Sequence, residues 1–178
     1  MGDVTALEAY ELTTRGGATD FARLIAACES FGPYCLIGGL AVNCYVEPVY
    51  TLDADIVIIA ASLPDLTTHL QQEGFKTEIH AHSVNALPPG SELRIQFTTD
   101  ERYQAFLARS AEAEVLGVRT KVACLEDVAL GKLWAYGDPR RRLSKRKKDE
   151  LDLIRLAEAY PELKSLYPSD LQAQLDRG

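Results

Sequence analysis

Apolar and polar positions along the chain follow two periods. Short runs rich in β-branched and aromatic residues are typical of strands, and apolar residues three and four apart are typical of helices. Strands are predicted at residues 34–37, 51–60, 75–80 and 93–98, with a hairpin or bulged pair at 113–123. Helices are predicted at residues 19–31, 40–45, 64–73, 100–109, 125–136, 147–159 and 169–175, and loops at 83–90 and 137–146.

The order of these elements predicts the fold class. Strands and helices are mixed without strict β-α-β alternation, which favours an α+β fold with a mixed central sheet flanked by helices and a helical C-terminal segment. We expect residues 1–124 to form the α/β core and residues 125–178 to pack on it, because 178 residues are typical of one domain.

Composition and charge narrow the class of protein. The net charge of −7 argues against general nucleic-acid binding, yet seven of the nine residues at 140–148 (RRRLSKRKK) are basic, so an acidic body carries one cationic segment. No apolar run is long enough to span a membrane, and the acidic N-terminus lacks the apolar region of an export signal. The four cysteines lack CxxC spacing and are expected to be reduced in a cytoplasmic protein.

Two carboxylates stand at the start of a predicted strand. Side chains alternate along a strand, so Asp53 and Asp55 point to the same face. Two adjacent like charges repel unless a cation lies between them, and Mg²⁺ commonly binds one or two carboxylates together with substrate phosphates. An isolated pair of this kind more often marks a strand end in water. Here Gly38 and Gly39 precede it across a short predicted helix, where the backbone can approach a phosphate closely.

These motifs together resemble a known family. Gly38-Gly39-Leu40-Ala41-Val42, Pro48, Thr51 and Asp53-Ala54-Asp55 are similar to the nucleotidyltransferase superfamily of the DNA polymerase β type. Within it, the chain looks most like the minimal proteins grouped with the AbiEii/AbiGii abortive-infection toxins. Lys132, the basic segment, Lys148-Asp149 and Asp152 extend the resemblance, which covers most of residues 34–157.

The resemblance implies an activity and a site. It implies a cytoplasmic enzyme that uses Mg²⁺ or Mn²⁺ to move a nucleoside monophosphate from a nucleoside triphosphate to a hydroxyl of RNA, such as tRNA, or of a protein. It also implies the toxin of a toxin–antitoxin or phage-defence pair, with a cognate antitoxin as partner. The implied catalytic residues are Asp53, Asp55, Lys132 and Asp149, with Asp53 and Asp55 as metal ligands. The implied nucleotide-binding residues are Gly38, Gly39, Thr51, Arg140 and Lys148.

One position departs from the pattern. The superfamily usually carries a third carboxylate on a neighbouring strand, and the matching position here falls at or near Gln96. An amide is a poor general base. Either Asp149 or Asp152 supplies the missing charge, or the chain is a degenerate member that binds nucleotide, RNA or a partner protein without chemistry.

The cationic residues also allow other readings. The segment at 140–148 could bind triphosphate, dock an RNA acceptor, bind an acidic protein, or remain a solvated loop. It contains no aromatic residue for base stacking. Lys132 could contact phosphate or lie along the surface of its helix. Asp152 could have no role beyond ion pairs with Lys148 and Arg155 on the surface of its helix.

Overall fold

The computed structural model describes residues 4–178. Its seven strands form one mixed sheet in the order β3-β4-β5-β2-β1-β7-β6. The strands are β1 (Tyr34–Ile37), β2 (Asp53–Ile58), β3 (Lys76–Ile79), β4 (Ser83–Leu87), β5 (Arg94–Thr98), β6 (Ala111–Val115) and β7 (Val118–Val122). The α+β class with a mixed sheet, expected from the sequence, is confirmed.

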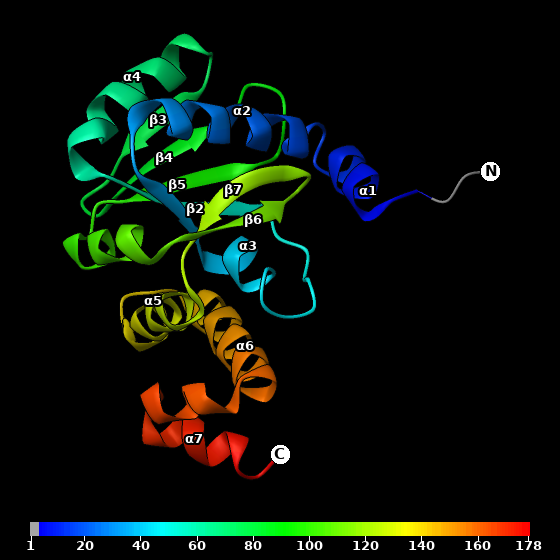
Figure 1. The fold of residues 1–178 in the computed structure, drawn as a ribbon, viewed down its shortest axis with the longest axis vertical. Coiled ribbons are helices and arrows are strands. Elements are labelled where there is room, and N and C mark those ends of the chain that lie inside the picture. Colours follow the sequence, from blue (N-terminus) through cyan, green and yellow to red (C-terminus); the bar gives the residue numbers. More distant parts are fainter. Residues whose placement is uncertain (1–3) are drawn as a thin grey trace.

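Helices cover the sheet and continue beyond it. The helices are α1 (Ala6–Thr13), α2 (Gly17–Phe31), α3 (Gly38–Val42), α4 (Leu63–Gln72), α5 (Leu125–Gly137), α6 (Leu143–Ala159) and α7 (Ser169–Leu175). Three 3-10 segments join them, η1 (Ala60–Ser62), η2 (Glu101–Arg109) and η3 (Pro161–Leu166). In Figure 1, α2 and α4 lie above the sheet, and α3 and the group α5, α6 and α7 lie below it.

The central strand β2 positions the carboxylates. It pairs antiparallel with β1 and parallel with β5, so both of its edges are hydrogen-bonded. Ala54, Ile56 and Ile58 are at most 1% exposed and belong to the main core. Alternation then forces Asp53 and Asp55 to the opposite face, which is the side of α3, α5 and α6.

The structure corrects three of the expected elements. Residues 83–87 form strand β4 rather than a loop, because Pro88 and Pro89 follow the strand instead of interrupting it. Helix α3 begins at Gly38 rather than after the glycine pair. Helix α6 begins at Leu143, so most of the basic segment is helical and not a loop. Lys and Arg are good helix formers, which permits this.

No helix within residues 4–178 combines the length and the apolar character that crossing a bilayer requires.

Candidate active site

Asp53 and Asp55 lie on one face of β2 beside strand β5. In the register of the sheet, Asp53 lies opposite Arg94 on β5. Asp55 lies between Gln96 on β5 and Ile37 on β1. A narrow hollow of about 40 Å³, partly open to solvent, lies in front of this face. Its walls come from the start of β2, the loop before it, α3, α5, α6 and the turn between those last two helices. They are lined by Gly39, Asn43, Val49, Tyr50, Thr51, Asp53, Asp55, Lys132, Arg141, Lys145, Lys148, Asp149 and Asp152.

The two glycines lie beside the carboxylates, with Gly39 in the wall of this hollow and Gly38 against Asp55. Gly38 has φ +69°, in the left-handed region, and a Cβ there would overlap the Asp55 carboxylate. A Cβ at Gly39 would make ordinary contact with Thr51, at 3.6 Å. Gly38 therefore lets a carboxylate lie directly against the first turn of α3. Thr51 is buried, and its hydroxyl accepts a hydrogen bond from the Asp53 backbone N–H at 3.2 Å.

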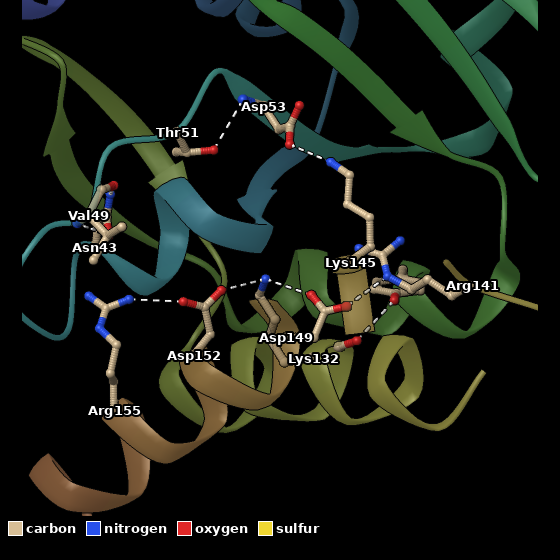
Figure 2. A network of polar contacts seen from close by, with 12 residues as sticks. Asn43, Val49, Thr51, Asp53, Lys132, Arg141, Lys145, Asp149, Asp152 and Arg155 are labelled. Carbon is tan, nitrogen blue, oxygen red and sulfur yellow. Dashed lines mark hydrogen bonds and ion pairs between the residues drawn. The ribbon is translucent and has the colours of Figure 1, made fainter. Parts of the chain in front are cut away.

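Asp53 is held by two cations. Arg94 Nε lies 2.7 Å from its Oδ1, and Lys145 Nζ donates to its Oδ2 at 3.0 Å, as Figure 2 shows for the lysine. Burial alone would raise the pKa of Asp53, but the Lys145 hydrogen bond and the charges of Lys145 and Arg94 outweigh it and lower the pKa. Asp53 is therefore ionised at neutral pH.

Asp55 has no such partner. Within residues 4–178 its carboxylate forms no side-chain hydrogen bond or ion pair, although it is largely surrounded by protein. Burial raises the pKa of Asp55, and the positive charge of Lys132 opposes this without cancelling it. An unpaired carboxylate beside an ionised one is the arrangement that a bound divalent cation would stabilise. The donor set therefore fits Mg²⁺ or Mn²⁺ held by Asp53 and Asp55 with substrate oxygens.

Lys132 is buried between two helices and binds two carboxylates of α6. Its Nζ lies 3.0 Å from Asp149 Oδ1 and 2.7 Å from Asp152 Oδ2 (Figure 2). Burial acts to lower the pKa of Lys132, but Asp152 and Asp149 outweigh it and raise the pKa. Lys132 thus carries a fixed charge that joins α5 to α6 under the hollow.

The acids of α6 are already committed to cations. Asp149, 1% exposed, also accepts from Arg141 Nε at 2.7 Å, and Asp152 accepts from Arg155 Nη1 at 2.9 Å. The helix-surface pair expected between Asp152 and Lys148 is replaced by the bond to Lys132. Arg155 also donates to the carbonyl of Glu47, which ties α6 to the loop before β2.

Within the described residues, no third acid completes a metal-binding cluster with Asp53 and Asp55. Residues 4–178 contain no cluster of three or more His, Cys, Asp or Glu side chains arranged to hold a metal. Gln96 is the residue paired with Asp55 on β5, which is the register expected of the missing carboxylate. Asp100 is instead bound to Arg102, and Glu92 to Arg15.

The basic segment contributes unevenly to the hollow. Arg141, Lys145 and Lys148 line it, whereas Arg140 points into a separate groove and pairs with Asp138 at 3.2 Å. Sequence reasoning singled out Arg140 and Lys148 and missed Arg94, Arg141 and Lys145 as individuals. Arg94 had a signal, since it lies two positions before Gln96 on an alternating strand and must face the same side. Arg141 and Lys145 had no such signal, because their positions at the hollow depend on how α6 packs.

Comparisons with solved structures identify the fold. The antibiotic-resistance factor ANT(2'')-Ia matches with a TM-score of 0.60 and 17% identity, over 90% of this chain and 95% of that one. A nucleotidyltransferase-like protein from Paracoccidioides brasiliensis matches with a TM-score of 0.56 and 21% identity, over 90% and 86%. The lincosamide antibiotic adenylyltransferase LnuA, solved with lincomycin bound, matches with a TM-score of 0.53 and 14% identity, over 89% and 99%.

Sequence comparison adds nothing to this: no protein-family model matches the chain, and neither does any curated protein. Identities of this size establish architecture and not substrate. The fold is that of the nucleotidyltransferases, as the motifs around Gly38 and Asp53 predicted, and the grouping with the AbiEii-type toxins is not confirmed.

Proposed function

We propose that this protein is a magnesium-dependent nucleotidyltransferase that moves a nucleoside monophosphate from a nucleoside triphosphate to a hydroxyl of RNA or protein. The observation that carries the proposal is the paired face of Asp53 and Asp55, which shares one hollow with Gly39, Arg141, Lys145 and Lys148. Carboxylates for a cation and cations for phosphate thus lie in a single space. The lincosamide adenylyltransferase LnuA, which shares the fold, supports the reaction class.

Each residue of the hollow has a distinct role in this proposal. Asp53 and Asp55 hold the divalent ion, which when bound offsets the negative charge of the phosphates. The backbone of Gly38 and Gly39 and the hydroxyl of Thr51 lie against the triphosphate. Arg141, Lys145 and Lys148 neutralise the β- and γ-phosphates. Lys132 and Asp149 position Arg141 and α6 rather than touching the reacting atoms.

The transfer balances without further reactants. The acceptor oxygen forms a bond to the α-phosphorus while the bond from that phosphorus to the bridging oxygen breaks, and pyrophosphate leaves. The hydroxyl proton passes to solvent, because Gln96 cannot accept it as a carboxylate would. Chemistry in this site therefore depends on positioning and charge more than on a strong base.

The first prediction tests the reaction itself. The protein is incubated with Mg²⁺, total cell RNA and protein, and each triphosphate labelled at the α-phosphate. We expect the α-phosphate label to enter either the RNA or the protein fraction. In a parallel incubation with triphosphate labelled at the γ-phosphate, the label should appear only in pyrophosphate. Asp53→Asn should lower the rate at least 100-fold, because it removes one charge from the cation site.

The matched control is Asp65→Asn, an exposed aspartate on α4 across the sheet. It should label at the wild-type rate. Transfer by Asp53→Asn at the wild-type rate would refute the proposal.

A second candidate is a module that binds nucleotide, RNA or a partner protein without catalysis. Two observations favour it: Gln96 stands beside Asp55, and Arg94 and Lys145 already neutralise Asp53. Calorimetric titration of Mg²⁺ with each triphosphate, followed by product analysis, separates the two. Binding without release of pyrophosphate identifies the binding module.

A toxin role, with a cognate antitoxin as partner, belongs to the same proposal and is supported by the sequence resemblance alone. Induced expression should then arrest growth of a bacterial host, and Asp53→Asn should relieve the arrest. Equal growth under both proteins would remove the toxin role without affecting the proposed chemistry.

A further inference from the structure

Three hollows lie in a row across the site and meet at shared residues. The hollow of the two carboxylates shares Asp55, Lys132, Arg141 and Asp149 with a second hollow that contains Gln96. This second hollow shares Tyr103, Ala135 and Arg141 with an open groove of about 840 Å³. Asp55 therefore borders both hollows. The first contains Gly39 and the lysines proposed for the triphosphate, and the second contains Gly38 and Gln96 and leads to the groove.

The floor of the groove is a stack of flat groups. The Arg102 guanidinium lies 4.5 Å above the ring centroid of Trp134, which in turn stacks on Phe106 at 5.6 Å and 16°. Asp100 binds Arg102 through Nε and Nη2 and fixes its plane. The side chain of Arg102 is 57% exposed, so its outer face is open to the groove. A guanidinium plane held in this way is a stacking surface for a nucleobase.

The charge of the groove selects against polycations. Its two acids are each paired with an arginine, Asp100 with Arg102 and Asp138 with Arg140. The side chain of Arg140 is 78% exposed, and Arg141 adds a further positive charge at the inner end of the groove. His82 and Thr98 add polar groups at the outer end. A phosphate can displace a carboxylate from an exposed arginine such as Arg140 at little cost. The groove thus offers a flat platform next to an exposed guanidinium.

We propose that this groove binds the hydroxyl acceptor and that the acceptor is a nucleotide: its base stacks on Arg102 over Trp134 and its phosphate meets Arg140. The nucleotide is the end of a single strand of RNA, because the groove is open along its length and a strand can leave it freely. Its terminal ribose hydroxyl then reaches Asp55 past Gln96. This inference rests on the proposed function and names its substrate class.

Trp134 is the only tryptophan in the chain, so its fluorescence reports on the groove directly. The full-length protein, without divalent ions, is titrated with a five-nucleotide single-stranded RNA, the same sequence as a duplex, a nucleoside monophosphate, inorganic phosphate and a polyamine. We expect a saturable change with the single strand, a weaker one with the monophosphate, and none with the other three. A response to the duplex or the polyamine equal to that of the single strand would overturn the proposal.

Two variants test the platform. Arg102→Lys keeps the charge and loses the plane, and should weaken binding of the single strand about tenfold. Arg119→Lys, on the exposed side of β7, is the matched control and should leave binding unchanged. Circular dichroism melting shows whether each variant is folded. Wild-type affinity in Arg102→Lys would overturn the proposal, and equal affinity for the monophosphate and the strand would overturn its assignment to a strand end.

The outcomes separate this inference from the proposed function. If Asp53→Asn abolishes transfer but Arg102→Lys binds RNA normally, the groove inference fails alone. If no triphosphate is consumed, yet single-stranded RNA binds in a manner that depends on Arg102, the proposed chemistry fails alone.

Discussion

Gly38 and Asp55 are in direct contact where β1 passes into α3. The left-handed backbone of Gly38 and the missing Cβ both serve the same end, which is to leave room for the Asp55 carboxylate. A side chain at position 38 is unfavourable for two reasons: the backbone has a positive φ, and a Cβ would overlap the Asp55 carboxylate. The glycine pair is therefore asymmetric, since Gly39 has room for a methyl group beside Thr51.

This asymmetry gives a prediction for two matched variants. Gly38→Ala should lower the free energy of unfolding by about 1–3 kcal/mol, because alanine pays for the positive φ and must displace Asp55. Gly39→Ala should change it by less than about 1 kcal/mol, since it sits in a helix without overlap. Urea unfolding of both proteins measures the difference. Equal stabilities would mean that Asp55 moves aside freely.

At the scale of elements, α5 and α6 are joined by charge as well as by apolar packing. Lys132 leaves α5 and ends between two carboxylates of α6, while Arg141, in the turn between the helices, binds one of the same pair. Each charge in this network is compensated by another. Removing one partner leaves the other charge unpaired in an interior of low polarity.

Lys132→Met should therefore cost about 1–3 kcal/mol of stability, because Asp149 and Asp152 lose a shared cation while almost out of contact with water and keep only Arg141 and Arg155. The matched control is Lys147→Met on the outside of α6, where the pair with Glu150 has a lysine 66% exposed, and should cost less than about 1 kcal/mol. Chemical denaturation followed by circular dichroism measures both. A small loss in Lys132→Met would show that water reaches the network.

The elements also show what the sequence could and could not predict. The shared face of Asp53 and Asp55 follows from strand alternation, which is a local property, and β2 is observed at Asp53–Ile58. Strand β4 was missed because two prolines next to it read as a loop. The contacts of Lys132 with Asp152 and of Lys145 with Asp53 could not be predicted, since they depend on where α6 docks and not on any spacing within α6.

At the scale of the whole molecule, charge is separated along the chain. The protein has a net charge of −7 and a cationic segment, of which Arg140, Arg141, Lys145 and Lys148 line the hollow or the groove. An anion approaching from solvent is repelled by most of the surface and attracted at one place. Such fields act over about 10 Å at 0.1 M salt and shorten as salt increases.

Binding of a triphosphate should accordingly weaken with ionic strength. Between 0.05 and 0.3 M salt we expect the dissociation constant, measured by calorimetry, to increase several-fold. Lys148→Gln should reduce this dependence, because Lys148 lines the hollow, whereas Lys76→Gln on β3, away from the hollow, should not. A dissociation constant that does not vary with salt would exclude a major contribution from the segment.

The parallel pairing of β2 with β5 has a consequence for how the protein folds. Asp55 and Gln96 are neighbours in the sheet although about forty residues separate them, and α5 and α6 add their side chains only after a further thirty. Contacts this distant form slowly, because the intervening chain loses entropy before the pairing stabilises it. The candidate site is therefore complete only when segments from β2 to α6 have come together, and a polypeptide interrupted anywhere between them lacks part of it.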